Sequence, residues 1–362
     1  MGGGRTTDHR PPATIFCRLP TAHCSLPTVM IHIHNGDSAA NSARQSSLPG
    51  EHIAWREPLI TGPTPLGLSD DEWLEVRSKH LSEAYGVDLQ QCRRDLLSQQ
   101  EVLASFADHE EVVLWFEHDL FCQLPLLYLL DWFSRRAPHQ TKLTLICIGE
   151  FPGKANFRGL GELSPEELAS LFPKRQQVTP NQLNLAASGW QAYCSADPTR
   201  IEAFLQADSS ALPFVDTALR AHLQRFPSTR NGLGRIENRA LQFIHDGLNR
   251  FSDLFTKFGE AEPVYGLGDA QFWLALRQLS AATQPLITIS GTGTEKPGQQ
   301  VLTPEVVPNA KLELTELGES VRKDEADFVR LNDLDLWLGG VHLQEQNNSW
   351  RWDEGAERIV LT

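Results

Sequence analysis

The sequence predicts an α/β protein, with a Rossmann-like, mainly parallel sheet followed by a helical region and a winged-helix-like domain. Three observations predict this class. Strand-length apolar runs at 30–35, 111–116 and 142–148 alternate with helical patterns, which is typical of parallel strands joined by helices. Helical patterns dominate from about residue 153. Between 228 and 322, three helical patterns precede two short strand patterns, the order of a winged helix.

Composition narrows the classes of protein that this chain resembles. Its 362 residues are 41 % hydrophobic and 22 % charged, as in ordinary soluble domains. A net charge of -14 repels nucleic acid at long range. No apolar run reaches the roughly 18 residues that a membrane helix needs, so we expect no membrane association. The six cysteines form no Cys-x-x-Cys pair, which disfavours a zinc ribbon and favours a reduced, cytoplasmic protein.

Changes in composition divide the chain into five predicted segments. They are a disordered arm at 1–29, an α/β domain at 30–152, a helical connector at 153–227, a winged-helix-like domain at 228–322 and an extension with a hairpin at 323–362. The arm is rich in Gly, Pro, Thr and Arg. Met30 directly precedes the first strand and is a candidate start of translation.

The α/β domain begins with a strand from Met30 that ends in a tight Gly36-Asp37-Ser38 turn, where Ser38 begins a helix. A second strand is predicted at 51–57, before a loop rich in Pro and Gly. Ser69 and Asp88 are predicted N-caps of two helices. The run at 111–116 is apolar throughout, which suits a parallel strand covered on both faces. A helix begins near Phe121, and the third long run follows at 142–148.

Shorter patterns fill the rest of the chain. Residues 179–226 read as several helices. The winged-helix-like domain combines helices near 236–244, 251–258 and 269–282 with strands at 286–289 and 311–314, a Gly-rich turn at 291–298 and a last helix to Val321. A hairpin is predicted from 350–352 and 358–361.

Polar residues at the strand ends are the candidate site, because the carboxyl ends of parallel strands meet at one edge. Side chains alternate along a strand, so Glu117 and Asp119 face one side and His118 the other. With Asp37, these two carboxylates are candidate ligands of a divalent cation, and with His118 they are candidate acid and base groups. The alternative is a strand-end acidic pair, with Asp119 as a helix N-cap.

The same edge is a candidate site for a small anionic ligand. The Asn35-Gly36 turn offers backbone N–H donors, and Arg56 offers a bidentate guanidinium. Arg56 is equally suited to neutralise Asp37 or Glu117. No Walker motif and no G-x-G-x-x-G follows a strand, so the commonest ATP and NAD binding modes lack support.

Two further patterns concern one serine and two histidines. A Gly-Asp-Ser turn is similar to the turn that carries the nucleophile of SGNH-type esterases, which makes Ser38 a candidate nucleophile. The later Gly-x-Asn-Asp block and the Asp-x-x-His base are missing, and His342 has no Asp three residues before it. His32 and His34 share one strand face and can bind a metal; a hydrogen-bonded core position is favoured.

The winged-helix-like domain is a poor match for a DNA reader. Its third helix offers Asp269, Gln271, Arg277 and Gln278, and its wing offers Lys296. Acidic neighbours make phosphate contacts unfavourable. We therefore favour a packing or protein-interaction role over DNA binding.

Three motifs together resemble the bacterial family named domain of unknown function 1835. They are His32-x-x-Asn35-Gly36-Asp37-Ser38, Trp55-Arg56-Glu57-x-Leu59-x-x-Gly62-Pro63 and Leu114-Trp115-Phe116-Glu117-His118-Asp119-Leu-x-x-Gln123-Leu124. The resemblance covers about residues 30–150 and brings no established activity. It implies that Asn35, Gly36, Asp37, Ser38, Arg56, Glu57, Glu117, His118, Asp119 and Gln123 are motif positions. Glu57 and Cys122 depart from the family pattern, where Asp and an acidic residue, respectively, are expected.

These features favour an enzyme or a binder of phosphate- or nucleotide-type ligands, with Asn35, Gly36, Arg56, Glu57 and Gln123 as ligand contacts. The cofactor is undetermined, and a divalent cation is the candidate. The competing hypotheses are a regulatory or scaffolding protein that uses its winged helix, and an SGNH-like hydrolase.

Overall fold

The computed structural model describes residues 30–136, 140–291, 310–344 and 350–362. The predicted arm at 1–29 and the Gly-rich turn from residue 292, with Lys296, lie outside the described residues. In the described part of the chain, no helix is both long enough and apolar enough to span a bilayer.

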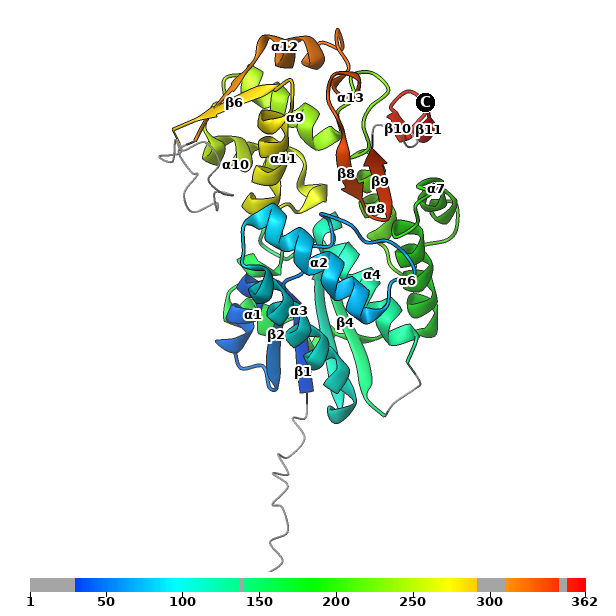
Figure 1. Cartoon of the computed structure of the whole chain (residues 1–362). Helices are drawn as coiled ribbons and strands as arrows, with labels where there is room; N and C mark the ends of the chain where they lie inside the picture. The colour runs from blue at the N-terminus through cyan, green and yellow to red at the C-terminus, as the bar shows by residue number, and fades with distance from the viewer. Residues whose placement is uncertain (1–29, 137–139, 292–309, 345–349) are drawn as a thin grey trace, which may run out of the picture.

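The molecule is a mixed α/β protein built on a five-stranded, mostly parallel sheet (Figure 1). Its strands are β1 (Met30–Asn35), β2 (Glu51–Trp55), β3 (Glu111–Glu117), β4 (Lys142–Ile148) and β5 (Gln176–Gln177), in the spatial order β2-β1-β3-β4-β5. β1 to β4 are parallel, and β5 pairs antiparallel with β4. Because β2 and β3 lie on opposite sides of β1, the strand order reverses between β1 and β3. In open parallel sheets, that reversal point is the usual ligand site.

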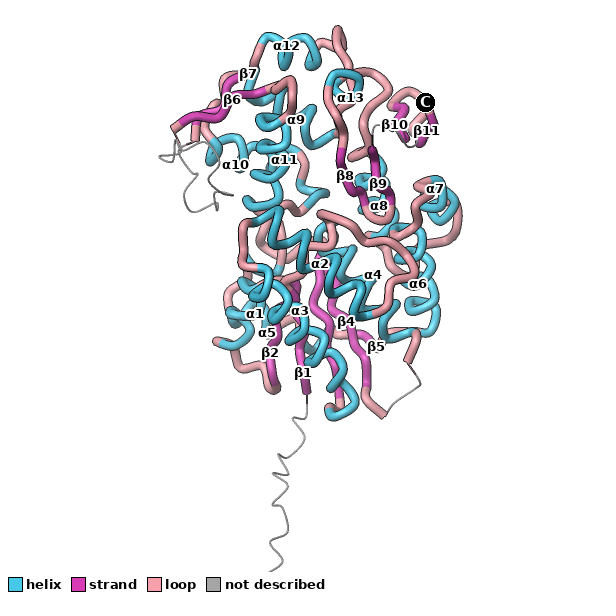
Figure 2. Tube along the Cα trace, viewed as in Figure 1, coloured by secondary structure: helices cyan, strands magenta, loops and turns pink. Residues whose placement is uncertain are grey.

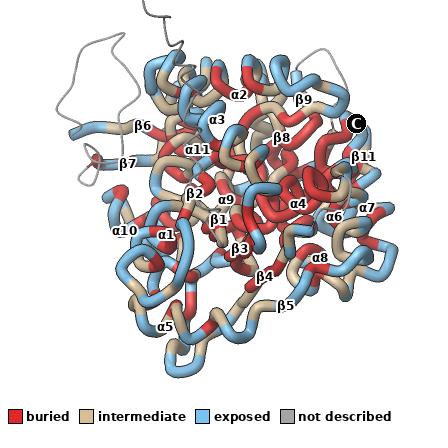
Figure 3. The backbone as a smooth tube through the Cα atoms, turned by 90° about the horizontal axis from the view of Figure 1, so that it is seen from below, coloured by how far each residue is buried: buried red, intermediate tan, exposed pale blue. Residues whose placement is uncertain are grey.

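Helices cover both faces of this sheet (Figure 2). On one face, β1 places Ile31 and Ile33 in a core with α3 (Leu89–Ala104) and α4 (Leu120–Ser134). On the other, β3 places Val113 and Trp115 against α1 (Asp37–Arg44) and the segment around α5 (Pro165–Ala169). The central strand β3 is buried along its whole length, as its continuous apolar run predicts (Figure 3).

The remaining elements are helical, with three small antiparallel sheets. They are α2 (Asp70–Tyr85), which packs on α3, then α6 (Pro180–Tyr193), α7 (Thr199–Leu205), α8 (Val215–Leu223), α9 (Arg235–His245), α10 (Phe251–Ala261), α11 (Asp269–Ala281), β6 (Ile287–Ser290), β7 (Lys311–Leu314), α12 (Glu316–Arg322), α13 (Phe328–Leu331), β8 (Asp335–Leu338), β9 (Val341–Gln344), β10 (Trp350–Asp353) and β11 (Arg358–Leu361). Short 3-10 turns include η2 (Leu160–Glu162) and η4 (Pro263–Tyr265).

Several boundaries differ from those predicted. Helix α1 begins at Asp37, with Gly36 at its N-cap at a φ of 90°, a conformation that favours glycine. Strand β2 ends at Trp55, two residues early. The β8–β9 hairpin was not predicted, although its Gly339-Gly340 turn is a typical hairpin signal. The predicted β10–β11 hairpin is confirmed.

Candidate functional site

The carboxyl ends of β1, β2 and β3 lie at one edge of the sheet. Asn35 is in register with Trp55, and the Gly36 amide donates to the Trp55 carbonyl at 3.0 Å. A Cβ at Gly36 would meet nothing within 4 Å, so the turn after β1 faces open space. Residues from the three sequence motifs therefore gather at this edge.

Asp37 and Arg56 form a bidentate ion pair at the outer part of this edge. Arg56 donates through Nε and Nη2 to the two carboxylate oxygens at 2.8 and 2.7 Å. Both side chains remain about half exposed. The hydrogen bonds from Arg56 lower the pKa of Asp37. This is the neutralising role that the sequence left open for Arg56.

Glu117 lies inside the edge, where both of its oxygens already have partners. Oε1 accepts the Leu160 amide at 2.7 Å, and Oε2 accepts the Cys122 thiol at 2.8 Å. Asn35 donates to the same sulfur at 2.6 Å. Burial, and then the charge of Asp119, raise the pKa of Glu117 to about 7. This carboxyl group is held in a closed network that links β1, β3, α4 and η2.

Asp119 is the N-cap of α4, the alternative that the sequence left open, and accepts the Cys122 amide at 2.9 Å. Its carboxylate lies against Gly266, where a Cβ would overlap it. Gln123 donates to the Glu117 carbonyl at 2.5 Å. His118 packs edge-on against Phe214, and its buried Nδ1 has no hydrogen-bond partner among the described residues.

The three acids predicted as metal ligands are not brought together. Within the described residues, the one group of three or more potential ligands whose donor atoms lie within 4.8 Å of one another is His32, His34 and His52. Asp37 is instead paired with Arg56, while Glu117 and Asp119 are buried.

The histidine cluster on β1 and β2 is organised by hydrogen bonds. His32 uses both ring nitrogens, with the Pro49 carbonyl at 2.8 Å and the Trp115 indole at 3.0 Å. His34 and His52 share a contact of 3.1 Å. Burial, and then the charge of His52, lower the pKa of His32 to about 4. His32 therefore fits the favoured interpretation of a hydrogen-bonded core residue, whereas His34 Nδ1 and His52 Nε2 are buried without a hydrogen-bond partner among the described residues.

Ser38 and Glu57 also have partners. The Ser38 hydroxyl donates to the Gly161 carbonyl at 2.9 Å, rather than to a histidine. His342 lies on β9 and contacts Asp335 at 2.6 Å. Glu57 forms a buried ion pair with Arg77 at 2.7 Å. These contacts give all three side chains partners within the protein, and no histidine of the described residues contacts the Ser38 hydroxyl as a base would.

A pocket of about 350 Å³ opens beside the end of β2, between α2, α3 and α11. We call it the Arg56 pocket. Its lining is mainly apolar and includes Leu81, Val87, Cys92, Leu96, Trp273 and Leu274. Polar groups at its wall include Arg56, Gln99, Gln271 and Arg277, together with the carboxyl groups of Glu57 and Asp95. An apolar pocket with a few polar groups is the usual form of a small-molecule site.

A second pocket of about 650 Å³, the His342 pocket, adjoins it. The two share Ala84, Gln271 and Leu274 as lining residues. The His342 pocket lies between the loop at 61–65, helices α2, α9 and α11, and the β8–β9 hairpin, and it is more polar. Together the pockets form a cleft between the sheet-containing part of the chain and the helices that follow it.

Arg277 is the cleft residue whose role the sequence reasoning missed. The sequence places it on a helix face considered for DNA contact, whereas its side chain donates to the Ala84 carbonyl of α2 at 3.3 Å. It is half-buried, burial lowers its pKa, and no carboxylate of the described residues pairs with it. The signal for Arg277 in the sequence was its position, one helical turn after Trp273 on an apolar helix face.

Comparison with protein-family models finds no match to this chain. Comparison with curated proteins also finds none. The function therefore has to be inferred from the geometry of the site.

Proposed function

We propose that this protein binds a small organic anion in the Arg56 pocket. The observation that carries the proposal is Arg277, a half-buried guanidinium without a carboxylate partner among the described residues, at the wall of an apolar pocket. Withdrawing a cation from water is costly unless it is paired. An anionic group on a ligand would supply that partner, and the apolar lining would cover the ligand body.

Arg56 supports the same assignment from the sheet edge. It lines the pocket, and its Nε and Nη2 donate to the Asp37 carboxylate. Its Nη1 makes no hydrogen bond to the described residues. The ligand would thus lie next to the carboxyl end of β2, the strand beside β1. This extends the sequence hypothesis of an anionic ligand at the edge. The resemblance to domain of unknown function 1835 and a cytoplasmic location remain part of the proposal.

A winged-helix arrangement of α9, α10, α11, β6 and β7 is also part of the proposal, with a packing role. Helix α11, in the position of a recognition helix, packs on α2. Gln271 donates to the Tyr85 hydroxyl at 3.3 Å, and Arg277 contacts Ala84. A recognition helix must enter the major groove, and α2 occupies that face. The contact therefore argues against the DNA-binding alternative.

A thermal-shift screen with benzoate, indole-3-acetate, nucleoside monophosphates and phosphorylated sugars tests the proposal, since a ligand of the native state raises Tm. We expect at least one compound with an apolar body and one anionic group to raise Tm in a saturable manner. Arg277→Gln should weaken its binding about tenfold. Arg94→Gln is the matched control, because Arg94 is exposed on α3, lies outside the pocket lining and, among the described residues, donates to Gln91 alone. Equal binding by both variants would place the ligand elsewhere.

A further inference from the structure

A third pocket, of about 230 Å³, lies along the polar face of α9, and we call it the arginine pocket. Four of its lining residues follow the helical spacing i, i+3, i+4, i+7, namely Arg235, Asn238, Arg239 and Gln242. Arg322 of α12 and the turn that carries Arg230 and Asn231 close it. Four guanidinium groups against two carboxylates line this pocket in a chain whose net charge is -14.

Two of the lining arginines share a single carboxylate as their partner. Glu262, which is 5 % exposed, accepts Nε and Nη2 of Arg235 at 3.0–3.2 Å and Nε of Arg239 at 2.6 Å. In the described part of the chain, Nη1 of Arg235 and both terminal nitrogens of Arg239 donate no hydrogen bond. One carboxylate thus fixes two of the lining guanidinium groups, and each of them keeps N–H donors that no described residue uses.

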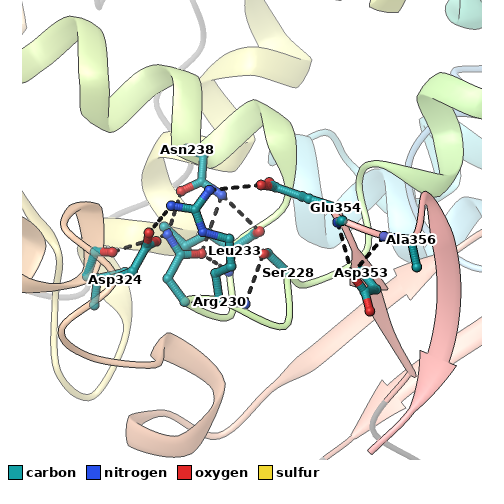
Figure 4. A network of polar contacts seen from close by, with 11 residues as sticks. Ser228, Arg230, Leu233, Asn238, Asp324, Asp353, Glu354 and Ala356 are labelled. Carbon is teal, nitrogen blue, oxygen red and sulfur yellow. Dashed lines mark hydrogen bonds and ion pairs between the residues drawn. The ribbon is translucent and has the colours of Figure 1, made fainter.

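The mouth of the pocket is set by two further arginines. Arg322 is held by Glu319 at 2.9 Å and donates to Gln242 at 3.3 Å. Arg230 lies between Asp324 on one side and Glu354 on the other, and it pairs with both (Figure 4). Its side chain is the most exposed of the four arginines. Arg230 therefore lies at the opening, where exchanging a carboxylate partner for a ligand costs little.

We propose that the arginine pocket binds a phosphoryl oxyanion, either free phosphate or the phosphate group of a small monoester. Guanidinium groups match the geometry of phosphate oxygens through paired N–H donors. The amides of Asn231 and Asn238 brace the same wall, because each donates to the other and to a backbone carbonyl. Asn231 also organises the turn, because its Oδ1 accepts the Leu233 amide at 3.1 Å.

The charge around the pocket favours a small anion over a nucleic acid. Asp324 and Glu354 form part of the lining, and Asp353 lies next to Glu354 (Figure 4). A polyanion that followed the surface would meet all of these carboxylates, whereas a single phosphate group would need only the guanidinium donors of Arg235 and Arg239 that no described residue uses. The site is separate from the Arg56 pocket and shares no lining residue with it.

Isothermal titration calorimetry of the full chain with sodium phosphate at pH 7.5 and constant ionic strength tests this proposal. We expect saturable binding by the wild type, at least tenfold weaker binding by Arg239→Gln, and unchanged binding by the charge-matched control Arg94→Gln. Methyl phosphate forms a second arm, in which binding would extend the site to monoesters. Arg277→Gln should bind phosphate as the wild type does, which keeps this test independent of the Arg56 pocket.

Three outcomes would overturn the proposal. They are the absence of saturable phosphate binding by the wild type, equal binding by the Arg239→Gln and Arg94→Gln variants, and stronger binding of a single-stranded oligonucleotide that Arg239→Gln abolishes. If Arg239→Gln fails to fold, as judged by circular dichroism, Arg230→Gln replaces it. That variant removes the most exposed guanidinium of the pocket and should weaken phosphate binding by a smaller factor.

Discussion

Arg77 on α2 is fully buried and is the anchor of the loop that follows β2. Its Nε donates to Glu57 at 2.7 Å, and its terminal nitrogens donate to the carbonyls of Pro58, Thr61 and Pro63. One side chain therefore satisfies four acceptors of a segment that proline and glycine keep from forming regular structure. Glu57 is the partner that makes this burial tolerable.

We predict that Arg77→Ala destabilises the protein by about 3–5 kcal/mol, since it leaves Glu57 buried without a counter-charge. Urea unfolding monitored by circular dichroism would measure the change. The control is Arg220→Ala, which breaks the exposed pair of Arg220 with Asp216 and should cost less than about 1 kcal/mol. Similar losses for both variants would contradict the role given to Arg77.

Glu117 predicts a pH dependence of stability. Its folded pKa of about 7 lies above the ordinary value of 4.5, so the folded state binds this proton more tightly than the unfolded state does. The free energy of unfolding should therefore fall by a total on the order of 3 kcal/mol as the pH rises from 4.5 to 7. Above that range, this group should contribute little further change. Comparing urea unfolding of the wild type and Glu117→Gln at pH 5, 6, 7 and 8 tests this, because the variant should lack that component. Parallel pH profiles would refute it.

At the scale of elements, the contact between η4 and the start of α4 joins the two halves of the chain. Gly266 ends η4 at a φ of 60°, and a Cβ there would overlap the Asp119 carboxylate. The N-cap of α4 is thus enclosed by a turn almost 150 residues later in the sequence. This enclosure accounts for the burial that raises the pKa of Asp119.

Gly266→Ala should therefore destabilise the protein more than Gly67→Ala does. Gly67 has a φ of 85° and open space around its missing Cβ, so its replacement costs only the backbone strain of about 1–2 kcal/mol. At Gly266 the same strain is joined by the overlap with Asp119. Thermal unfolding of the two variants would give the comparison, and equal Tm losses would show that the turn can move away from α4.

The elements with strong local signals were predictable from sequence. The run from Glu111 to Phe116 is apolar at nearly every position, and the structure confirms it as a buried central strand. The β8–β9 hairpin was missed because each strand is only four residues long and its apolar side chains are buried by other parts of the chain. Strand β5 has two exposed glutamines and pairs only because β4 offers a free edge. Such elements depend on tertiary contacts that no local pattern carries.

At the scale of the whole molecule, one apolar core runs through the predicted segments. The same cluster contains Ile33 and Leu114 of the sheet, Leu276 of α11 and Leu343 of β9. Strand ends could be expected to meet at one edge because parallel strands share a direction. The cleft could not be expected, since α2 and α11 are more than 180 residues apart and only their packing creates it. The ion pair of Glu57 with Arg77 was likewise hidden, because Arg77 lies 20 residues later on α2, whereas pairing of Arg56 with Asp37 was one of the alternatives that the sequence left open.

This shared core predicts a single cooperative unfolding transition. Urea unfolding monitored by far-ultraviolet circular dichroism and by tryptophan fluorescence should give coincident curves, because Trp115 lies in the sheet and Trp273 in α11. Two separated transitions would mean that the sheet-containing part and the later helices are independent units.

The Gly339-Gly340 turn has a consequence for synthesis on the ribosome. Its backbone bonds to Thr64 and Tyr193, with the Thr64 amide donating to Gly339 and the Gly340 amide donating to the Tyr193 carbonyl. While residue 340 is still untranslated or inside the ribosome, the loop after β2 and the end of α6 lack these contacts. The loop after β2 therefore gains these backbone contacts only from residues translated about 275 codons after Thr64.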